Sequence, residues 1–262
     1  ERTKDELPQG AAGRTVMTTE PKFIPNEAVE IQITPNLTVR LRMVDCVGYR
    51  VEGALGYEED DGPRMVSTPW FEEPIPFQEA AEIGTRKVIS EHSTMGLVMT
   101  TDGSITEIDR ESYIDAEERV IEEMKDINRP FLVLLNSTNA EGEEAQQLAA
   151  ELTEKYDVPV LPINCAQMTQ ADILNILEKL LYEFPVNEVN ISLPPWVEEL
   201  DFKHWLRQKF EDSVRETVKN VRRLRDVNGA VESLAEYEFV DQVSLHSLDM
   251  GTGSASIGIT SD

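Results

Sequence analysis

The sequence predicts an α/β protein with a doubly wound, mostly parallel sheet, followed by the start of a second α/β domain. Two observations lead to this prediction. Apolar strands alternate with amphipathic helices between residues 95 and 184, as in parallel sheets with crossover helices. Further upstream, an alternating strand ends in Asp45-Cys46-Val47-Gly48, and a D-x-x-G segment after an apolar strand holds Mg²⁺ and the γ-phosphate in many nucleotide hydrolases.

An antiparallel hairpin at the edge of the sheet is expected to carry this segment. Residues 29–34 and 37–43 both alternate apolar with polar side chains, and a short Pro-Asn turn separates them. The second strand then delivers Asp45 to a sheet end, where α/β folds bind their ligands. Asp45 is therefore the candidate Mg²⁺ ligand and Gly48 a candidate nucleotide-binding residue. A simple turn residue is the alternative interpretation of Asp45.

Two threonines form a second candidate group, in the loop before the hairpin. Translation-type GTPases keep in that loop a threonine that ligates Mg²⁺ and closes over the γ-phosphate. Thr18 and Thr19 lie in this position, within the sequence Arg14–Pro21. Both are candidate catalytic and metal-binding residues; the alternative is that either one merely caps a turn.

The sequence lacks a Walker phosphate-binding loop. Residues 10–15 (GAAGRT) have too short a gap between their glycines, carry Arg in place of Lys and follow a polar segment. A nucleotide site without a phosphate cradle is incomplete. We therefore expect a P-loop GTPase-like domain whose Walker A strand and loop are missing from this chain, which by itself would be inactive. A domain that has lost its activity is the alternative.

The elements after the hairpin continue the parallel sheet. Strands are expected at residues 95–101, 131–136 and 158–164, and helices at residues 112–127, 142–156 and 171–184. Ser112 and Asp115 stand at capping-box spacing in the first of these helices. With one more strand at residues 186–193, the first domain would comprise residues 1–193 and the second residues 194–262.

The loop after the strand at residues 131–136 bears on nucleotide choice. Guanine-specific relatives of such a fold carry Asn-Lys-x-Asp there, and the Asp pairs with the guanine edge. This sequence has Asn136 followed by Ser-Thr-Asn, so Asn136 remains a nucleotide-binding candidate while the Lys and Asp are absent. ATP is therefore expected rather than GTP. Tyr49 stands where many GTPases carry the Gln that orients water, so another group would have to position the nucleophile.

Composition limits the partners of the chain. A net charge of −26 argues against nucleic acid, since binding a phosphate backbone needs a positive surface. Two cysteines fit a reducing compartment without a disulfide framework, and the three histidines have no zinc spacing. Because no apolar run is long enough to span a bilayer, membrane contact would have to come through a partner.

A long insertion lies between Tyr49 and Gln78 and is rich in Pro, Gly and acidic residues. Loops of this length inside a compact domain are usually functional. Trp70 and Phe71 lie within it and predict a self-assembly surface anchored by aromatic side chains. A solvated acidic excursion is the alternative.

The second domain is expected to begin with one long helix from about Trp196 to Val227, after a Pro-Pro break. Its basic side chains would form one face, which is either solvated or turned toward an acidic neighbouring subunit. They are Lys203, Arg207, Lys209, Arg215, Lys219, Arg222, Arg223 and Arg225. A β-hairpin of residues 238–248 and 256–260 is expected to follow.

Several long strings carry a resemblance to one family. They are DELPQGAAGRTVMTTEPKF at residues 5–23, MVDCVGY at 43–49, GPRMVSTPWFEEPIPF at 62–77, AAEIGTRKVI at 80–89, and HWLR and RRLRDV at 204–207 and 222–227. Through them the chain resembles, over nearly its whole length, the stage IV sporulation protein A group of spore-coat morphogenetic ATPases from endospore-forming bacteria. Strings this long and unusual are highly specific.

The resemblance implies an ATP-hydrolysing protein of the mother-cell cytoplasm that polymerises with itself on the forespore surface, as the basement layer of the spore coat. It implies ATP and Mg²⁺ as cofactors, Asp45 as the Walker B acid, and Thr18 and Thr19 as candidate sensor threonines. The implied partners are a small amphipathic membrane-anchoring sporulation peptide, at the outer forespore membrane, and other spore-coat morphogenetic proteins. A non-hydrolysing scaffold on a degenerate nucleotide-binding fold is the alternative function.

Overall fold

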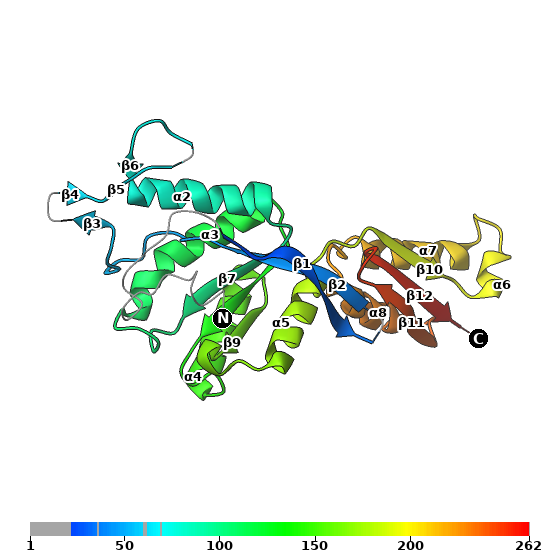
Figure 1. Cartoon of the computed structure of the whole chain (residues 1–262). Coiled ribbons are helices and arrows are strands. Elements are labelled where there is room, and N and C mark those ends of the chain that lie inside the picture. The colour runs from blue at the N-terminus through cyan, green and yellow to red at the C-terminus, as the bar shows by residue number, and fades with distance from the viewer. Residues whose placement is uncertain (1–21, 36, 60–61, 69, 262) are drawn as a thin grey trace. The chain divides into compact units, whose positions relative to one another are not determined.

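The computed structural model of this chain describes residues 22–35, 37–59, 62–68 and 70–261 (Figure 1). The chain divides into two compact units, Glu1–Ile176 and Leu177–Asp262. Thr18 and Thr19 lie outside the described residues. In the part of the chain that the structure describes, no helix is both long and apolar enough to cross a bilayer.

The predicted hairpin is confirmed. β1 (Lys22–Thr34) pairs antiparallel with β2 (Leu37–Asp45), from Lys22 opposite Asp45 to Thr34 opposite Leu37. Half-buried and exposed side chains alternate along most of β2, as expected for a strand with one face packed. Among the described residues these two strands pair only with each other, so the hairpin is a separate two-stranded sheet rather than the edge of the larger one.

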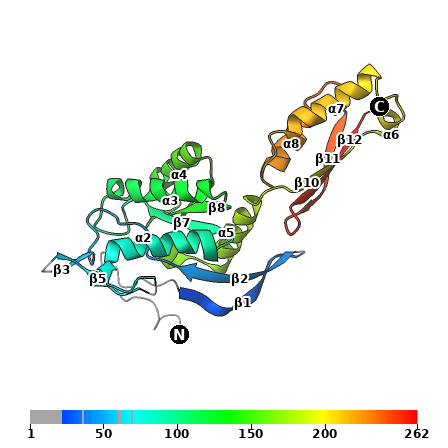
Figure 2. The same ribbon diagram turned by 90° about the horizontal axis from the view of Figure 1, so that it is seen from above.

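A parallel three-stranded sheet forms the centre of the first unit (Figure 2). Its order is β7 (Gly96–Thr101), β8 (Phe131–Asn136) and β9 (Val160–Ile163). Each strand lies within two residues of its predicted bounds. In this register Thr101, Asn136 and Ile163 are neighbours at the carboxyl edge of the sheet. The first unit is therefore a mixed α/β fold with a parallel sheet.

Helices α3 (Ile114–Asp126) and α4 (Glu143–Tyr156) supply apolar side chains to the core on this sheet. Ile121 from α3, Leu152 from α4 and Val133 from β8 belong to one buried cluster. The first five residues of β8 are all buried, which is typical of a central parallel strand covered on both faces. The apolar residues of α4 recur at helical spacing, so both elements were predictable from the sequence.

The start of α3 differs from its prediction. A 3-10 turn, Arg110–Tyr113, precedes the helix, and Tyr113 takes the N-cap position without a side-chain hydrogen bond. The N–H of Ser112 donates to the carbonyl of Asp109 at 3.1 Å, so Ser112 belongs to the turn. The capping box expected at Ser112 is therefore absent from this helix.

The segment between Tyr49 and Gln78 contains small paired elements. β3 (Glu58–Glu59) pairs with β4 (Gly62–Pro63), and β5 (Met65–Val66) pairs with β6 (Ile75–Pro76). The ring of Tyr57 packs edge-on against that of Phe77, with 5.3 Å between ring centres, and both residues are buried. Phe77 begins α2 (Phe77–Lys87), a helix not predicted from the sequence, which continues into a π-helical turn, Val88–His92.

The second unit contains a three-stranded sheet. α5 (Gln170–Tyr182) leads into it along the chain. β10 (Glu188–Ser192) pairs parallel with β12 (Ser254–Thr260), and β12 pairs antiparallel with β11 (Gln242–Asp249), so the predicted hairpin is confirmed. β10 differs from the expectation that placed residues 186–193 in the first domain. Its half-buried Val189 and Ile191 pack on the apolar cluster around Ile257, and this pairing draws β10 into the second unit.

The predicted long helix from Trp196 to Val227 is wrong. The structure has three helices: α6 (Pro195–Glu198), α7 (Trp205–Val218) and α8 (Asp226–Ala235). Between α6 and α7, two backbone N–H groups donate to side chains instead of to the carbonyl groups of a continuous helix. The carboxylate of Asp201 accepts the N–H of Lys203 at 2.8 Å, and Nδ1 of His204 accepts the N–H of Leu206 at 3.3 Å. Local bonds of this kind compete with a continuous helix.

The basic side chains of this region do not form one free face. Arg207 donates to the carbonyl of Leu200 at 2.8 Å and pairs with Glu211 at 2.9 Å. Arg223 pairs with the buried Glu183 at 3.0 Å. Because these guanidinium groups already have partners within the second unit, the expectation of a continuous basic face for an acidic neighbour loses its support.

Candidate functional site

Asp45 is the last residue of β2 and is exposed, as predicted for a residue delivered to the end of a strand. Three residues later, Gly48 has a φ of +82°, a left-handed conformation that side-chain-bearing residues rarely adopt. A Cβ atom at Gly48 would meet no atom within 4 Å, so the backbone conformation, and not crowding, is what requires glycine here. The D-x-x-G segment therefore ends in a tight turn.

Thr85 of α2 holds this turn through its hydroxyl group. The N–H of Gly48 donates to Oγ1 of Thr85 at 3.0 Å, and the same hydroxyl donates to the carbonyl of Gly48 at 3.3 Å. Thr85 is only 2% exposed. Sequence reasoning missed Thr85 because it did not predict α2, although the side chain is one of the buried polar groups that must find a hydrogen-bond partner.

Cys46, between Asp45 and Gly48, is not an activated thiol. Burial raises the pKa of the Cys46 thiol, and the neighbouring charge of Asp45 raises it further. The hydrogen bond from Thr85 acts in the opposite direction but is outweighed. The thiolate is the reactive form of cysteine, so a raised pKa does not favour a nucleophilic role for Cys46.

Tyr49 follows the turn and is buried, with 7% of its surface exposed. Its hydroxyl donates to a carboxylate oxygen of Glu123 on α3, and the guanidinium of Arg119 lies 4.0 Å from the centre of its ring. Burial, followed by the hydrogen bond to Glu123, strongly raises the pKa of Tyr49. A neutral phenol already bonded to Glu123 is a poor group for orienting water, so Tyr49 does not replace the glutamine found in GTPases.

Charged side chains join α2 to α3 beside this turn. Arg119 on α3 pairs with Glu82 on α2 at 2.8 Å, and Arg86 on α2 lies 3.6 Å from Glu123 on α3. The hydrogen bond from Arg119 is the largest cause that lowers the pKa of Glu82 below its ordinary value. Residues 45–49 are thus held by two helices that are themselves tied to each other.

Asn136 lies at the carboxyl edge of the parallel sheet, at the end of β8. Its side-chain oxygen accepts the N–H of Cys165, in the loop after β9, at 3.0 Å. In the same region, Nδ2 of Asn164 donates to the carbonyl of Thr138 at 3.2 Å. The Asn136 side chain therefore connects two loops at the edge of the parallel sheet. Asp45 ends a strand of a different sheet, the β1–β2 hairpin.

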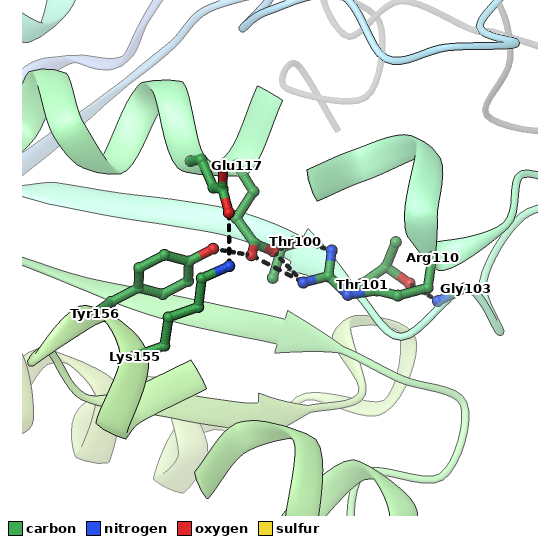
Figure 3. A network of polar contacts seen from close by, with 8 residues as sticks. Thr100, Thr101, Gly103, Arg110, Glu117, Lys155 and Tyr156 are labelled. Atoms are coloured by element: carbon green, nitrogen blue, oxygen red, sulfur yellow. Dashed lines mark hydrogen bonds and ion pairs between the residues drawn. The ribbon is translucent and has the colours of Figure 1, made fainter. Parts of the chain in front are cut away.

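A buried polar network supports the loop after β7 (Figure 3). Glu117 of α3 accepts hydrogen bonds from the hydroxyls of Thr100 and Tyr156 and pairs with the guanidinium of Arg110 at 2.8 Å. Burial, together with the bond to Glu117, raises the pKa of Tyr156 to about 12. Because every group of this network has a partner, we assign it the structural role of fixing residues 102–110 rather than a catalytic one.

The residues at the end of β2 suit part of a Mg²⁺–nucleotide site. Within the described ranges, no group of three or more His, Cys, Asp and Glu side chains is placed to hold a metal ion. Mg²⁺ bound with nucleotides does not need one, because it commonly takes one or two carboxylates and completes its shell with water and phosphate oxygens. The exposed carboxylate of Asp45 fits the carboxylate position of such a metal shell.

Comparison with known proteins identifies relatives along the whole chain. Residues 1–185 match the family described as "Stage IV sporulation protein A, ATPase domain", and residues 186–262 match "Stage IV sporulation protein A, middle domain". The boundary between the two matches places β10 with the second segment. Among solved structures, none shows a significant match.

Three curated relatives carry the name stage IV sporulation protein A. Those of Bacillus anthracis and Bacillus subtilis are each 54% identical to this chain, over 259 and 258 residues. That of Clostridioides difficile is 46% identical over 259 residues. The matches cover 98–99% of this chain but only 52–53% of the relatives, so the chain spans about half the length of the curated relatives it matches.

Proposed function

This chain belongs to the stage IV sporulation protein A family, and on that premise we propose that it is part of an ATP-hydrolysing, self-polymerising morphogenetic protein that forms the basement layer of the spore coat. The observation that carries the proposal is the turn at Asp45–Gly48, at the end of β2 within the matched ATPase domain. A non-hydrolysing scaffold is the second candidate, favoured by the exposed aromatic side chains of Phe202 and Trp205 in the second unit.

Two unpaired strand edges support a P-loop arrangement of the first unit. Within the described residues, β2 pairs only with β1, and β7 pairs only with β8, so each strand has one edge without a partner. A further parallel strand, carrying a Walker loop at its end, would satisfy both edges. We propose that such a strand comes from the part of the full-length protein outside this chain, which spans about half the length of its relatives, and that it completes a doubly wound sheet.

Each candidate residue has a role in this proposal. Asp45 holds Mg²⁺ through its water shell, and the N–H of Gly48 binds the γ-phosphate. Asp45 would hold the Mg²⁺, which would supply charge neutralisation at the phosphates. Thr18 and Thr19, outside the described residues, are proposed as the threonines that close over the γ-phosphate and help to place water. Tyr49 takes no part in the chemistry, because its hydroxyl is bonded to Glu123.

The loop after β8 supports ATP rather than GTP as the nucleotide. No Lys or Asp follows Asn136 at the positions that would recognise guanine. The side-chain oxygen of Asn136 is bonded to the backbone of Cys165, which supports a structural role for this residue over nucleotide contact.

Two exposed aromatic sites support self-association. In the first unit, Phe71 is 46% exposed and is followed by the exposed Glu72 and Glu73. In the second unit, Phe202 and Trp205 are 73% and 67% exposed, near each other in the sequence around the start of α7. Clustered exposed aromatic side chains are typical of interaction sites. We propose that such sites serve contacts with copies of the same protein, with other spore-coat morphogenetic proteins, and with a small amphipathic peptide at the outer forespore membrane, in the mother-cell cytoplasm.

The experiment that tests the proposed function measures ATP and GTP hydrolysis by the chain extended to the full length of its relatives. We expect hydrolysis of ATP in preference to GTP. Asp45→Ala should abolish it with the circular dichroism unchanged, because the exposed carboxylate is not part of the core. Glu232→Ala, a change of an exposed carboxylate on α8 in the second unit, is the control. Wild-type turnover by Asp45→Ala, or polymerisation without any hydrolysis, would favour the scaffold.

A further inference from the structure

The N–H of Gly48 already has a partner in this structure. It donates to Oγ1 of Thr85 at 3.0 Å, and the same hydroxyl donates back to the carbonyl of Gly48 at 3.3 Å. A buried threonine thus engages both polar backbone groups of one residue, at the glycine of the D-x-x-G segment. Gly48 must exchange Thr85 for another acceptor before its N–H can bind a phosphate oxygen, since one N–H makes one good hydrogen bond.

The surroundings limit where such an exchange can happen. Tyr49, the next residue, is buried and bonded to Glu123, so the chain is anchored directly after the turn. Asp45, before the turn, ends a paired strand. Movement is therefore confined to the residues between them, where Gly48 has the backbone freedom to change its φ and ψ angles. A short segment with a glycine hinge between two fixed residues, Asp45 and Tyr49, can adopt two alternative backbone conformations.

We propose that Thr85 is a positioning residue that holds the Gly48 N–H in the nucleotide-free and ADP-bound protein and releases it to the γ-phosphate of ATP. This inference rests on the proposed nucleotide site. ADP has no γ-phosphate and leaves the Thr85 bond intact, so the exchange makes the turn sensitive to the presence of that phosphate. Because Thr85 lies on α2, the exchange also breaks one link between the turn and that helix.

The proposal predicts that removing the hydroxyl favours ATP over ADP. Thr85→Val keeps the shape of the side chain but leaves the Gly48 N–H without its partner in the nucleotide-free and ADP-bound states. The ATP-bound state loses no hydrogen bond of the Gly48 N–H, because in that state this N–H donates to the γ-phosphate. The ratio of ATP to ADP affinity should then rise by about tenfold, the effect of one net hydrogen bond. A purely structural role of Thr85 leaves this ratio unchanged.

The test uses the chain extended to the full length of its relatives. Titration calorimetry gives the ATP and ADP affinities, and hydrogen exchange of the Gly48 amide gives a readout independent of catalysis. Thr85→Ser, which restores a hydroxyl, should return both quantities to wild-type values. Thr153→Val is the matched control, because Thr153 also donates to a carbonyl, that of Ala149 at 2.7 Å, and accepts an N–H, that of Val160 at 3.2 Å, but does so away from the turn.

We expect the nucleotide-free Thr85→Val protein to exchange the Gly48 amide at least about tenfold faster than wild type, and Thr153→Val to match wild type at this amide. An ATP to ADP affinity ratio within twofold of wild type in Thr85→Val would overturn the proposal. If the wild type binds neither nucleotide, the proposed function fails and the exchange mechanism with it. Faster amide exchange in Thr85→Val would then identify Thr85 as a structural clamp of the turn.

Discussion

The guanidinium of Arg110 lies 2.8 Å from the carboxylate of Glu117, whose side chain is 1% exposed. The two residues come from different elements, the 3-10 turn after the β7 loop and helix α3. Thr100 and Tyr156 donate to the same carboxylate, so three partners, from β7, the 3-10 turn and α4, meet at one buried acid of α3 (Figure 3). Loss of one partner therefore affects the fold of the first unit rather than a surface.

We expect Arg110→Met to lower the free energy of unfolding by about 3 kcal/mol, because it leaves the buried carboxylate of Glu117 without its opposite charge. Denaturation in urea, followed by circular dichroism, measures the effect. Arg215→Met is the control, since Arg215 pairs with Asp212 at 3.0 Å but both side chains are largely exposed. The control should cost less than about 1 kcal/mol. Equal effects of the two changes would contradict the assigned role of the buried pair.

The pair of Arg119 and Glu82 predicts a dependence of stability on acid pH. The hydrogen bond from Arg119 lowers the pKa of Glu82 below its ordinary value of 4.5, so the folded protein binds this proton less readily than the unfolded chain. The resulting stabilisation is present above that ordinary value and is lost as the pH falls through the lowered pKa. We expect the difference in unfolding free energy between wild type and Glu82→Gln to shrink as the pH is lowered from about 6 to about 3.

Glu79→Gln is the control for this measurement, since it changes another carboxylate on α2. Its stability relative to wild type is measured at the same pH values, so that a general effect of removing a carboxylate from α2 is separated from the effect of the Arg119 bond. A difference between wild type and Glu82→Gln that stays constant with pH would mean that the Arg119 bond contributes nothing to the folded state in solution.

The exposed aromatic pair of the second unit predicts an effect on assembly without an effect on folding. Phe202→Ser together with Trp205→Ser should weaken self-association, measured by sedimentation velocity and pelleting. The reason is that the apolar surface of these two side chains is removed from water only when a partner covers it. The melting temperature should change little, since both residues are largely exposed. Ile173→Ser, a change of a side chain that is 45% exposed in α5, is the control. Unchanged assembly of the double variant would exclude this surface from the polymer contact.

Helices and strands with a regular pattern of buried and exposed residues were predictable from the sequence. β8 is apolar because both of its faces are covered. α4 buries residues at helical spacing, and apolar and polar residues alternate in the β1–β2 hairpin on either side of a short turn. The D-x-x-G motif placed Asp45 at a strand end, which the structure bears out. In each case the signal is local, since the side-chain period of a helix or strand is written within a few residues.

Other features depended on contacts between distant parts of the chain. The break between α6 and α7 follows from hydrogen bonds that backbone N–H groups donate to the side chains of Asp201 and His204. The periodicity of the sequence does not show whether such local bonds form in place of helical ones. Thr85 acts on Gly48 across 37 positions of sequence. Asn136 remains a nucleotide-binding candidate from its motif position, and the structure adds that its side-chain oxygen accepts the N–H of Cys165, 29 residues away.

The sequence by itself determined the α/β class, the order of the strands and helices of the parallel sheet, the C-terminal hairpin and the family. Only the tertiary structure decided that β10 pairs with β12, that the basic residues after β10 are paired within the second unit, and that α2 holds the D-x-x-G turn. The physical reason is the range of the interactions. Side-chain periodicity acts over one helical turn or one strand, whereas strand pairing, buried ion pairs and hydrogen bonds such as that of Thr85 form only when folding brings distant residues together.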